Sequence, residues 1–191
     1  MDLRATRRRI ARERLSATRR FEKQKRQNLM AVSGRHKFII VLDHLKPAFN
    51  IGKIFRSGDA FGAQEVHVIG TSFFDPDPAK GSFKYVPARF YKDFQSCYDT
   101  LARLNYTLFT LQPDDGELLS AVELPVNSAF IFGNEEFGLS FRAEDFSAVK
   151  SLKIPQYGRV QSLNVSIAAS IVMYEYIRQY GSAPVPPPSG K

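Results

Sequence analysis

The chain has 191 residues, of which 43% are hydrophobic, which is enough for one globular domain with a sizeable core. No stretch approaches 18 consecutive apolar residues, and the Arg-rich start lacks the apolar core of a secretory signal, although it resembles an organelle transit peptide. The one cysteine, Cys97, cannot form an intrachain disulfide, and the histidines are too widely spaced for a zinc site. We therefore expect a cytoplasmic protein with no membrane association and no metal.

The formal net charge of +8 is concentrated at one end of the chain. Residues 1–37 hold 13 Lys or Arg and 3 Asp or Glu, whereas the remainder holds 14 basic and 16 acidic residues. A basic arm on a near-neutral domain is the electrostatic pattern of a protein that binds a phosphate backbone. A solvated helix is the alternative interpretation.

In chain order, the first predicted element is a helix over residues 4–30, which contain no Pro or Gly and only sparse apolar positions. Such a helix docks lightly, or orders only with a partner. Strands and helices then alternate, which indicates an α/β fold with a mostly parallel sheet and helices on both faces. The expected strands are 37–43, 65–69, 84–91, 106–111, 128–132 and 149–154, and the expected helices are 47–61, 93–104 and 164–179.

Three domain-level segments follow from this pattern. Residues 1–35 form a basic helical extension, residues 36–180 form the α/β domain, and the Pro-rich residues 181–191 form a disordered tail.

Three polar segments lie at the carboxyl ends of predicted strands, where parallel α/β sheets bind their ligands. They are residues 50–56, 132–139 and 154–164. Neither a G-x-x-x-x-G-K-[ST] loop nor a G-x-G-x-x-G loop after a strand is present, which counts against nucleotide hydrolysis and against a Rossmann-type enzyme. A G-x-S-x-G elbow is also absent, so a serine hydrolase is not expected.

The same three segments resemble the motifs of the SpoU/TrmH family in the SPOUT superfamily. Residues 50–56 read N-x-G-x-x-x-R and are followed by A-F-G, residues 133–139 read G-N-E-x-x-G-L, and residues 154–166 read I-P-x-x-G-x-x-x-S-L-N-V-S. The motifs occur in the family's order and span about residues 38–178. Together they are far more specific than any one of them alone.

The resemblance implies S-adenosylmethionine-dependent methylation of a ribose 2′-hydroxyl in tRNA or rRNA. It also implies a deep trefoil knot near the C-terminus, and a homodimer that shares its active sites between subunits. Main-chain atoms at Leu111, Gly133, Ile154 and Leu163 would hold the methyl donor. A non-catalytic RNA-binding protein that keeps the fold is the alternative.

The resemblance assigns the chemistry to five side chains. Arg56 is either the general base or a clamp on the adjacent phosphate and the developing alkoxide, because an arginine rarely loses its proton. Asn50, Ser162 and Asn164 position the ribose and the loops, and Glu135 orients Arg56 or a loop backbone. Four of them also have a purely structural alternative. Arg56 would then be a surface helix residue, Ser162 or Asn164 the N-cap of a helix, and Glu135 a solvated loop acid.

Further basic side chains are expected to contact RNA phosphates. They are Arg7, Arg8, Arg9, Arg12, Arg19, Arg20, Lys53 and Lys80.

The predicted helix 164–179 carries apolar residues over most of its circumference, more than one core face needs. Some of them should therefore pack against a second chain, and the small residues 168–170 would let a partner helix approach closely.

Overall fold

The computed structural model describes residues 3–112, 115–146 and 148–181. Within these residues a seven-stranded sheet has the order β3-β2-β1-β6-β4-β7-β5, and every neighbouring pair is parallel. This confirms the predicted α/β class with a mostly parallel sheet. The strands are β1 Phe38–Asp43, β2 Glu65–Ile69, β3 Ala88–Tyr91, β4 Thr107–Leu111, β5 Glu117–Leu118, β6 Ser128–Phe132 and β7 Val149–Lys153.

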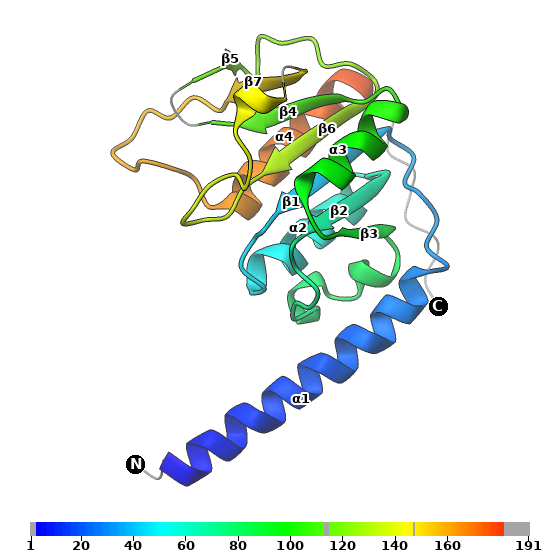
Figure 1. Ribbon diagram of the computed structural model, residues 1–191, viewed down its shortest axis with the longest axis vertical. Coiled ribbons are helices and arrows are strands. Elements are labelled where there is room, and N and C mark those ends of the chain that lie inside the picture. Colours follow the sequence, from blue (N-terminus) through cyan, green and yellow to red (C-terminus); the bar gives the residue numbers. More distant parts are fainter. Residues whose placement is uncertain (1–2, 113–114, 147, 182–191) are drawn as a thin grey trace.

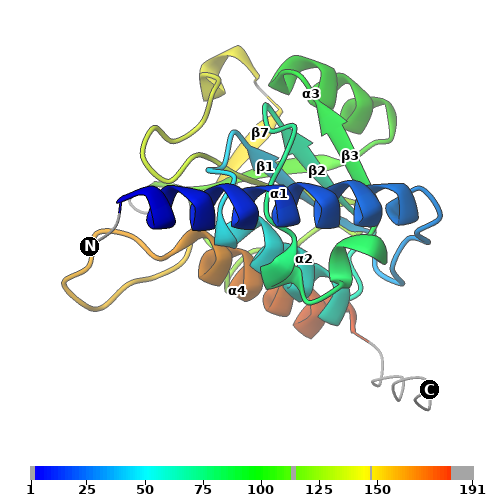
Figure 2. The same cartoon turned by 90° about the horizontal axis from the view of Figure 1, so that it is seen from below.

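Helices cover both faces of the sheet. Helix α3 lies on one face, and α2 and α4 lie on the other (Figure 2). No helix in the described part of the chain is both long and apolar enough to span a membrane. The helices are α1 Leu3–Asn28, α2 Phe49–Ala60, α3 Phe94–Arg103 and α4 Val165–Tyr180, with short 3-10 helices at Asp77–Ala79, Ser82–Lys84 and Ala143–Asp145.

Strand β1 shows why the sheet forms here. All six of its residues are buried, as expected for a central strand covered on both faces. Successive side chains of a strand point to opposite faces, so Phe38, Ile40 and Leu42 join the core under α2 and α4. Ile39 and Val41 join the core under α3.

The structure shortens one predicted strand and adds one that was not predicted. The strand expected at 84–91 begins only at Ala88, because Ser82–Lys84 forms a 3-10 helix that buries Phe83. The Ser82 hydroxyl donates to Asp59 Oδ2 at 2.8 Å, which fixes this turn against α2. Strand β5 was not predicted, because two exposed residues carry no periodicity.

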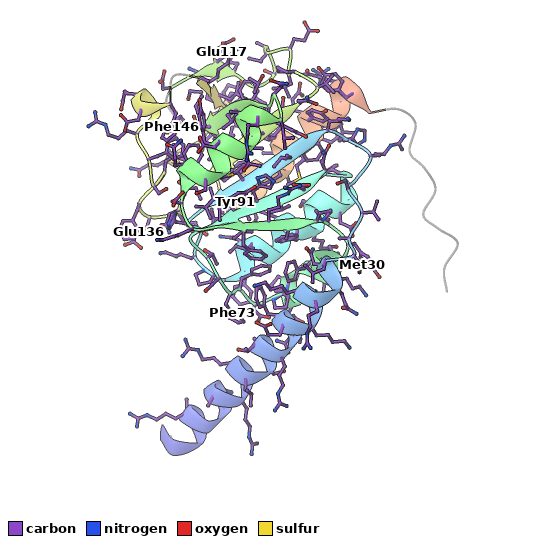
Figure 3. All side chains as sticks on the ribbon, turned by 45° about the vertical axis from the view of Figure 1, so that its right-hand side comes forward. Met30, Phe73, Tyr91, Glu117, Glu136 and Phe146 are labelled. Atoms are coloured by element: carbon purple, nitrogen blue, oxygen red, sulfur yellow. The ribbon has the colours of Figure 1, made fainter. Side chains whose placement is uncertain are left out.

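Helix α1 is docked over its C-terminal half. Phe21 is 1% exposed, and its ring lies 5.2 Å from those of Phe73 and Phe74 and 5.5 Å from that of Phe83. Figure 3 labels Phe73 at the junction of the helix and the domain. The half-helix therefore docks through a narrow buried stripe of Ala17, Phe21 and Asn28, as its sparse apolar positions predicted.

Asn28 fastens the end of α1 to the domain. Its side-chain amide donates to the carbonyls of Phe83 and Val86, and its Oδ1 accepts from the Ala88 amide at 3.0 Å. The opposite end of the helix projects away from the domain (Figure 1), and Leu15 is 54% exposed. The predicted tail beyond Gly181 lies outside the described residues.

Candidate functional site

The loops at the carboxyl ends of the strands surround a hollow of about 850 Å³. A smaller hollow of about 90 Å³ adjoins it, between the end of β4, the loop after β7 and the start of α4. All four predicted donor-site residues line these hollows: Leu111 and Leu163 line both, Gly133 the larger and Ile154 the smaller. Side chains of the second and third motifs complete the larger wall, including Glu135, Ser162 and Asn164.

A chain of hydrogen bonds joins the three motifs. Asn164 Nδ2 donates to Asn50 Oδ1 at 3.3 Å, and Asn50 Nδ2 donates to Glu135 Oε1 at 2.8 Å. The other oxygen of Glu135 accepts from the backbone amide of Lys46 at 3.1 Å. The first, second and third motifs are therefore held in one geometry at the mouth of the hollow.

Glu135 thus holds a loop backbone and Asn50, which is one of the two roles expected for it. Arg56 lies instead on the exposed face of α2, and its side chain neither lines a hollow nor bonds to any described residue. The structure therefore brings Asn50, Glu135, Ser162 and Asn164 together and leaves Arg56 apart.

Asn164 serves the fold and the site at once. Its Oδ1 caps α4 by accepting from the Ser166 amide at 3.0 Å and from the Ser166 hydroxyl at 2.6 Å. Its Nδ2 remains for Asn50. Ser162 is exposed and lines both hollows, with no described residue bonded to its hydroxyl.

A tight turn shapes the second motif. Asn134 and Gly138 pair through two backbone hydrogen bonds of 2.7 and 2.9 Å, and Asn134 Nδ2 donates to the carbonyl of His44 at 2.7 Å. A Cβ on Gly133 would lie 2.5 Å from the backbone of Gly138, so only glycine fits there. The glycine therefore lets the two ends of this turn pack closely against each other.

Asp43 supports the same turn and was not predicted. It is fully buried at the end of β1, and its carboxylate accepts from the Ser140 amide at 2.6 Å and the Ser140 hydroxyl at 2.7 Å. His44 Nδ1 lies 2.8 Å from the same carboxylate. A carboxylate that ends a buried parallel strand was the available signal.

Two titratable side chains, Lys46 and Cys97, have raised pKa values. Lys46 Nζ lies 2.7 Å from Glu136 Oε2, and this hydrogen bond raises the pKa of Lys46. Cys97 lies on the buried face of α3, where burial raises the pKa of its thiol to about 12, so it is a packing residue. Among the described residues, no three His, Cys, Asp or Glu side chains are grouped as a metal would require.

The predicted RNA contacts fall into two groups. Arg7, Arg9, Arg12 and Arg19 are exposed along α1, and the side chain of Arg8 lies outside the described part. Others are engaged within the chain: Arg20 donates to Asp75 at 3.4 Å, and Lys80 pairs with Asp77 at 3.3 Å. Lys53 is exposed on α2.

Helix α4 packs on α2 within the same chain. The hydroxyls of Ser57 and Ser170 lie 2.8 Å apart, and Ala169 is fully buried in the chain's own core. Ala169 therefore serves the intrachain core, which corrects the expectation that it receives a partner helix, whereas Ala168 and Ser170 stay partly exposed and their contact with a partner remains a prediction. Ile167 and Tyr174 remain 51% and 61% exposed on another face of α4.

Comparisons with known proteins agree with the motifs. A family model described as the SpoU rRNA Methylase family matches residues 37–174. A tRNA (guanosine(18)-2'-O)-methyltransferase from Thermus thermophilus is 31% identical over 144 residues, which cover 73% of this chain and 74% of the relative.

Two solved structures share the fold. The SpoU methyltransferase AviRb from Streptomyces viridochromogenes, crystallised with AdoMet, matches with a TM-score of 0.67 and 26% identity over 78% of this chain. That match spans only 59% of the AviRb chain. The TrmH/SpoU tRNA modifying enzyme of A. aeolicus matches with a TM-score of 0.67 and 25% identity, over 83% of this chain and 82% of its own.

Proposed function

The chain belongs to the SpoU rRNA Methylase family, and from that premise we propose that it transfers a methyl group from S-adenosylmethionine to a ribose 2′-hydroxyl in tRNA or rRNA. One observation carries the proposal: side chains of the second and third motifs line one hollow, and Asn50 of the first motif is bonded to Glu135 and Asn164 in its wall. A protein that only bound RNA would have no need of this arrangement.

The hollows suit the donor in size and lining. Together they offer apolar walls at Leu111, Ile154 and Leu163, and the main chain of Gly133 in the lining of the larger hollow. Such surfaces bind an adenosine through its ring faces and through main-chain hydrogen bonds. When bound, S-adenosylmethionine supplies an electrophilic methyl group.

The protein's task is to place the hydroxyl oxygen in line with that methyl group and to assist the loss of its proton. Asn50, Ser162 and Asn164 provide the polar groups that orient the ribose. Glu135 holds Asn50 and the Lys46 backbone in fixed positions through its two hydrogen bonds.

We assign Arg56 to clamping the adjacent phosphate and stabilising the developing alkoxide. A guanidinium keeps its proton in proteins and offers a fork of donors to phosphate oxygens. Its exposed side chain has no carboxylate partner among the described residues, so its charge is available to RNA.

Because Arg56 does not line the hollows of its own chain, we propose a homodimer in which it reaches the site of the partner. The exposed Ile167 and Tyr174, with Phe61 whose ring lies 6.5 Å from that of Tyr174, provide an apolar face for such pairing. A mixture of Arg56→Ala and Leu163→Arg chains should recover about a quarter of wild-type activity, because half the dimers then carry one intact site. A dimer that exchanges subunits without rescue would contradict the shared site.

The family also supports a deep trefoil knot in residues 36–180, with the chain near the third motif passing through the loop near the second. Residues of both loops line the larger hollow, so the two loops lie close together. We further propose that residues 1–35 bind RNA and that the protein works in the cytoplasm.

The direct test is transfer of tritium from labelled methyl donor into total RNA, in buffer that contains EDTA. We expect incorporation that is lost in Arg56→Ala. A chain that binds RNA and S-adenosylhomocysteine but transfers no label would instead be a non-catalytic RNA-binding protein.

A further inference from the structure

Gln156 carries an orphaned acceptor beside the proposed donor site. Three buried side-chain atoms have no hydrogen-bond partner in the described part of the chain: Arg20 Nε, Gln24 Oε1 and Gln156 Oε1. The first two lie on the docked half of α1. Gln156 lies in the loop after β7 and lines the smaller hollow. Folded proteins rarely keep a buried carbonyl without a hydrogen bond. We therefore expect a bound ligand to supply the hydrogen-bond donor for this oxygen.

The surroundings of Gln156 define that ligand. The small hollow is walled mainly by the apolar side chains of Leu111, Ile154, Leu163 and Ala168. Except for Ile154, these residues also line the larger hollow, so the two hollows lie side by side. A mostly apolar recess, whose polar side chains are Gln112, Gln156 and Ser162, suits the edge of a heteroaromatic ring that presents an N–H group.

Resting on the proposed use of S-adenosylmethionine, we propose that Gln156 Oε1 accepts a hydrogen bond from the 6-amino group of the donor's adenine. Gln156 then selects adenine over a 6-oxopurine. A 6-oxo group would place a second acceptor against Oε1, which leaves both oxygens unpaired in an apolar recess. Sites that lose a buried hydrogen bond in this way discriminate strongly.

The orientation of the amide is part of the proposal. With Oε1 inward, the site prefers a 6-amino group; with the amide nitrogen inward, it would prefer a 6-oxo group. Binding of the two purines therefore reports which atom faces the recess.

The test is calorimetry on the full chain with S-adenosylhomocysteine and with S-inosylhomocysteine. Wild type should bind the adenosyl compound at least about tenfold more tightly. Gln156→Met keeps the side-chain length but removes the acceptor, so affinity for S-adenosylhomocysteine should fall about 3- to 10-fold and the preference should narrow. Gln161→Met is the matched control, because Gln161 is exposed in the same loop and lines neither hollow.

Thermal unfolding without ligand separates this role from a structural one. Because Oε1 has no partner among the described residues, Gln156→Met should leave the melting temperature unchanged or higher. A lower melting temperature of Gln156→Met would assign Gln156 to the fold and overturn the proposal. Two binding results would also overturn it: a preference for the adenosyl over the inosyl compound that is unchanged in Gln156→Met, or a preference of wild type for the inosyl compound. Wild type that binds no S-adenosylhomocysteine at millimolar concentration would overturn the proposed function itself.

Discussion

Helix α1 and the carboxyl edge of the sheet both present polar side chains to solvent, but they hold them in different ways. At the sheet edge, Asn50, Glu135 and Asn164 restrain one another through hydrogen bonds. On the free half of α1, Arg7 and Arg12 extend from a helix that touches the domain only farther along. The edge is built for positioned chemistry, whereas the arm offers charge whose exact placement matters less.

The largest effect should come from the edge. Arg56→Ala should lower methyl transfer by roughly 100- to 1000-fold, because the charge that stabilises the reacting oxygen is removed. Affinity for S-adenosylhomocysteine should stay near wild type, since Arg56 does not line the hollows of its chain. Single-turnover kinetics and calorimetry check the two parts. Arg103→Ala, at the exposed end of α3, is the control, and a variant that keeps most of its turnover would refute the assigned role.

The second-largest effect should come from a substitution at the junction between α1 and the domain, where stability is expected to fall. Phe21→Ala removes the ring that packs among Phe73, Phe74 and Phe83, and should cost about 3–5 kcal/mol of α1 docking or of global stability. Hydrogen exchange along α1 and thermal unfolding measure the loss. Leu15→Ala, on the exposed half of the helix, should change stability by less than about 0.5 kcal/mol. Equal losses in both variants would mean that α1 is not docked through Phe21.

The arm itself should affect RNA affinity and not donor affinity. Deleting residues 1–16 removes the projecting Arg side chains but keeps Phe21 and Asn28, which anchor the helix. For every phosphate that the arm no longer neutralises, the log–log salt dependence of RNA binding should flatten by roughly 0.7–0.9. Fluorescence anisotropy at several salt concentrations measures this slope. An unchanged slope would show that the free half does not touch RNA.

The smallest effect should come from the supporting bonds at the edge. Asn50→Ala removes the link between Glu135 and Asn164, and should lower kcat/KM by about 5- to 10-fold, as expected for hydrogen bonds that orient and do not react. Ser72→Ala, an exposed residue in the loop after β2, is the control. A loss as large as that of Arg56→Ala would give Asn50 a direct part in the chemistry.

The sequence predicted what depends on local patterns. The continuous burial of Phe38–Asp43, the cap of α4 by Asn164 and the grouping of the motif loops all follow from an apolar run, a cap residue or motif spacing. Contacts between segments that are distant in the sequence could not be predicted from local patterns. The bond from Asp43 to Ser140 spans 97 residues, and the docking of Phe21 depends on rings more than 50 residues away. The unpaired oxygen of Gln156 could not be predicted, because it depends on the three-dimensional packing that leaves no hydrogen-bond donor near it.

The central claim is that the motif edge methylates ribose 2′-hydroxyls, and nucleoside analysis tests it most directly. Unmodified RNA transcripts should be incubated with the protein and S-adenosylmethionine, digested to nucleosides and examined by mass spectrometry, with Arg56→Ala in parallel. We predict a 2′-O-methylnucleoside that forms only with the wild-type chain, and loss of the product when the acceptor carries a 2′-deoxyribose. A methyl group on a base, or a product that persists on the 2′-deoxy acceptor, would contradict the proposed function.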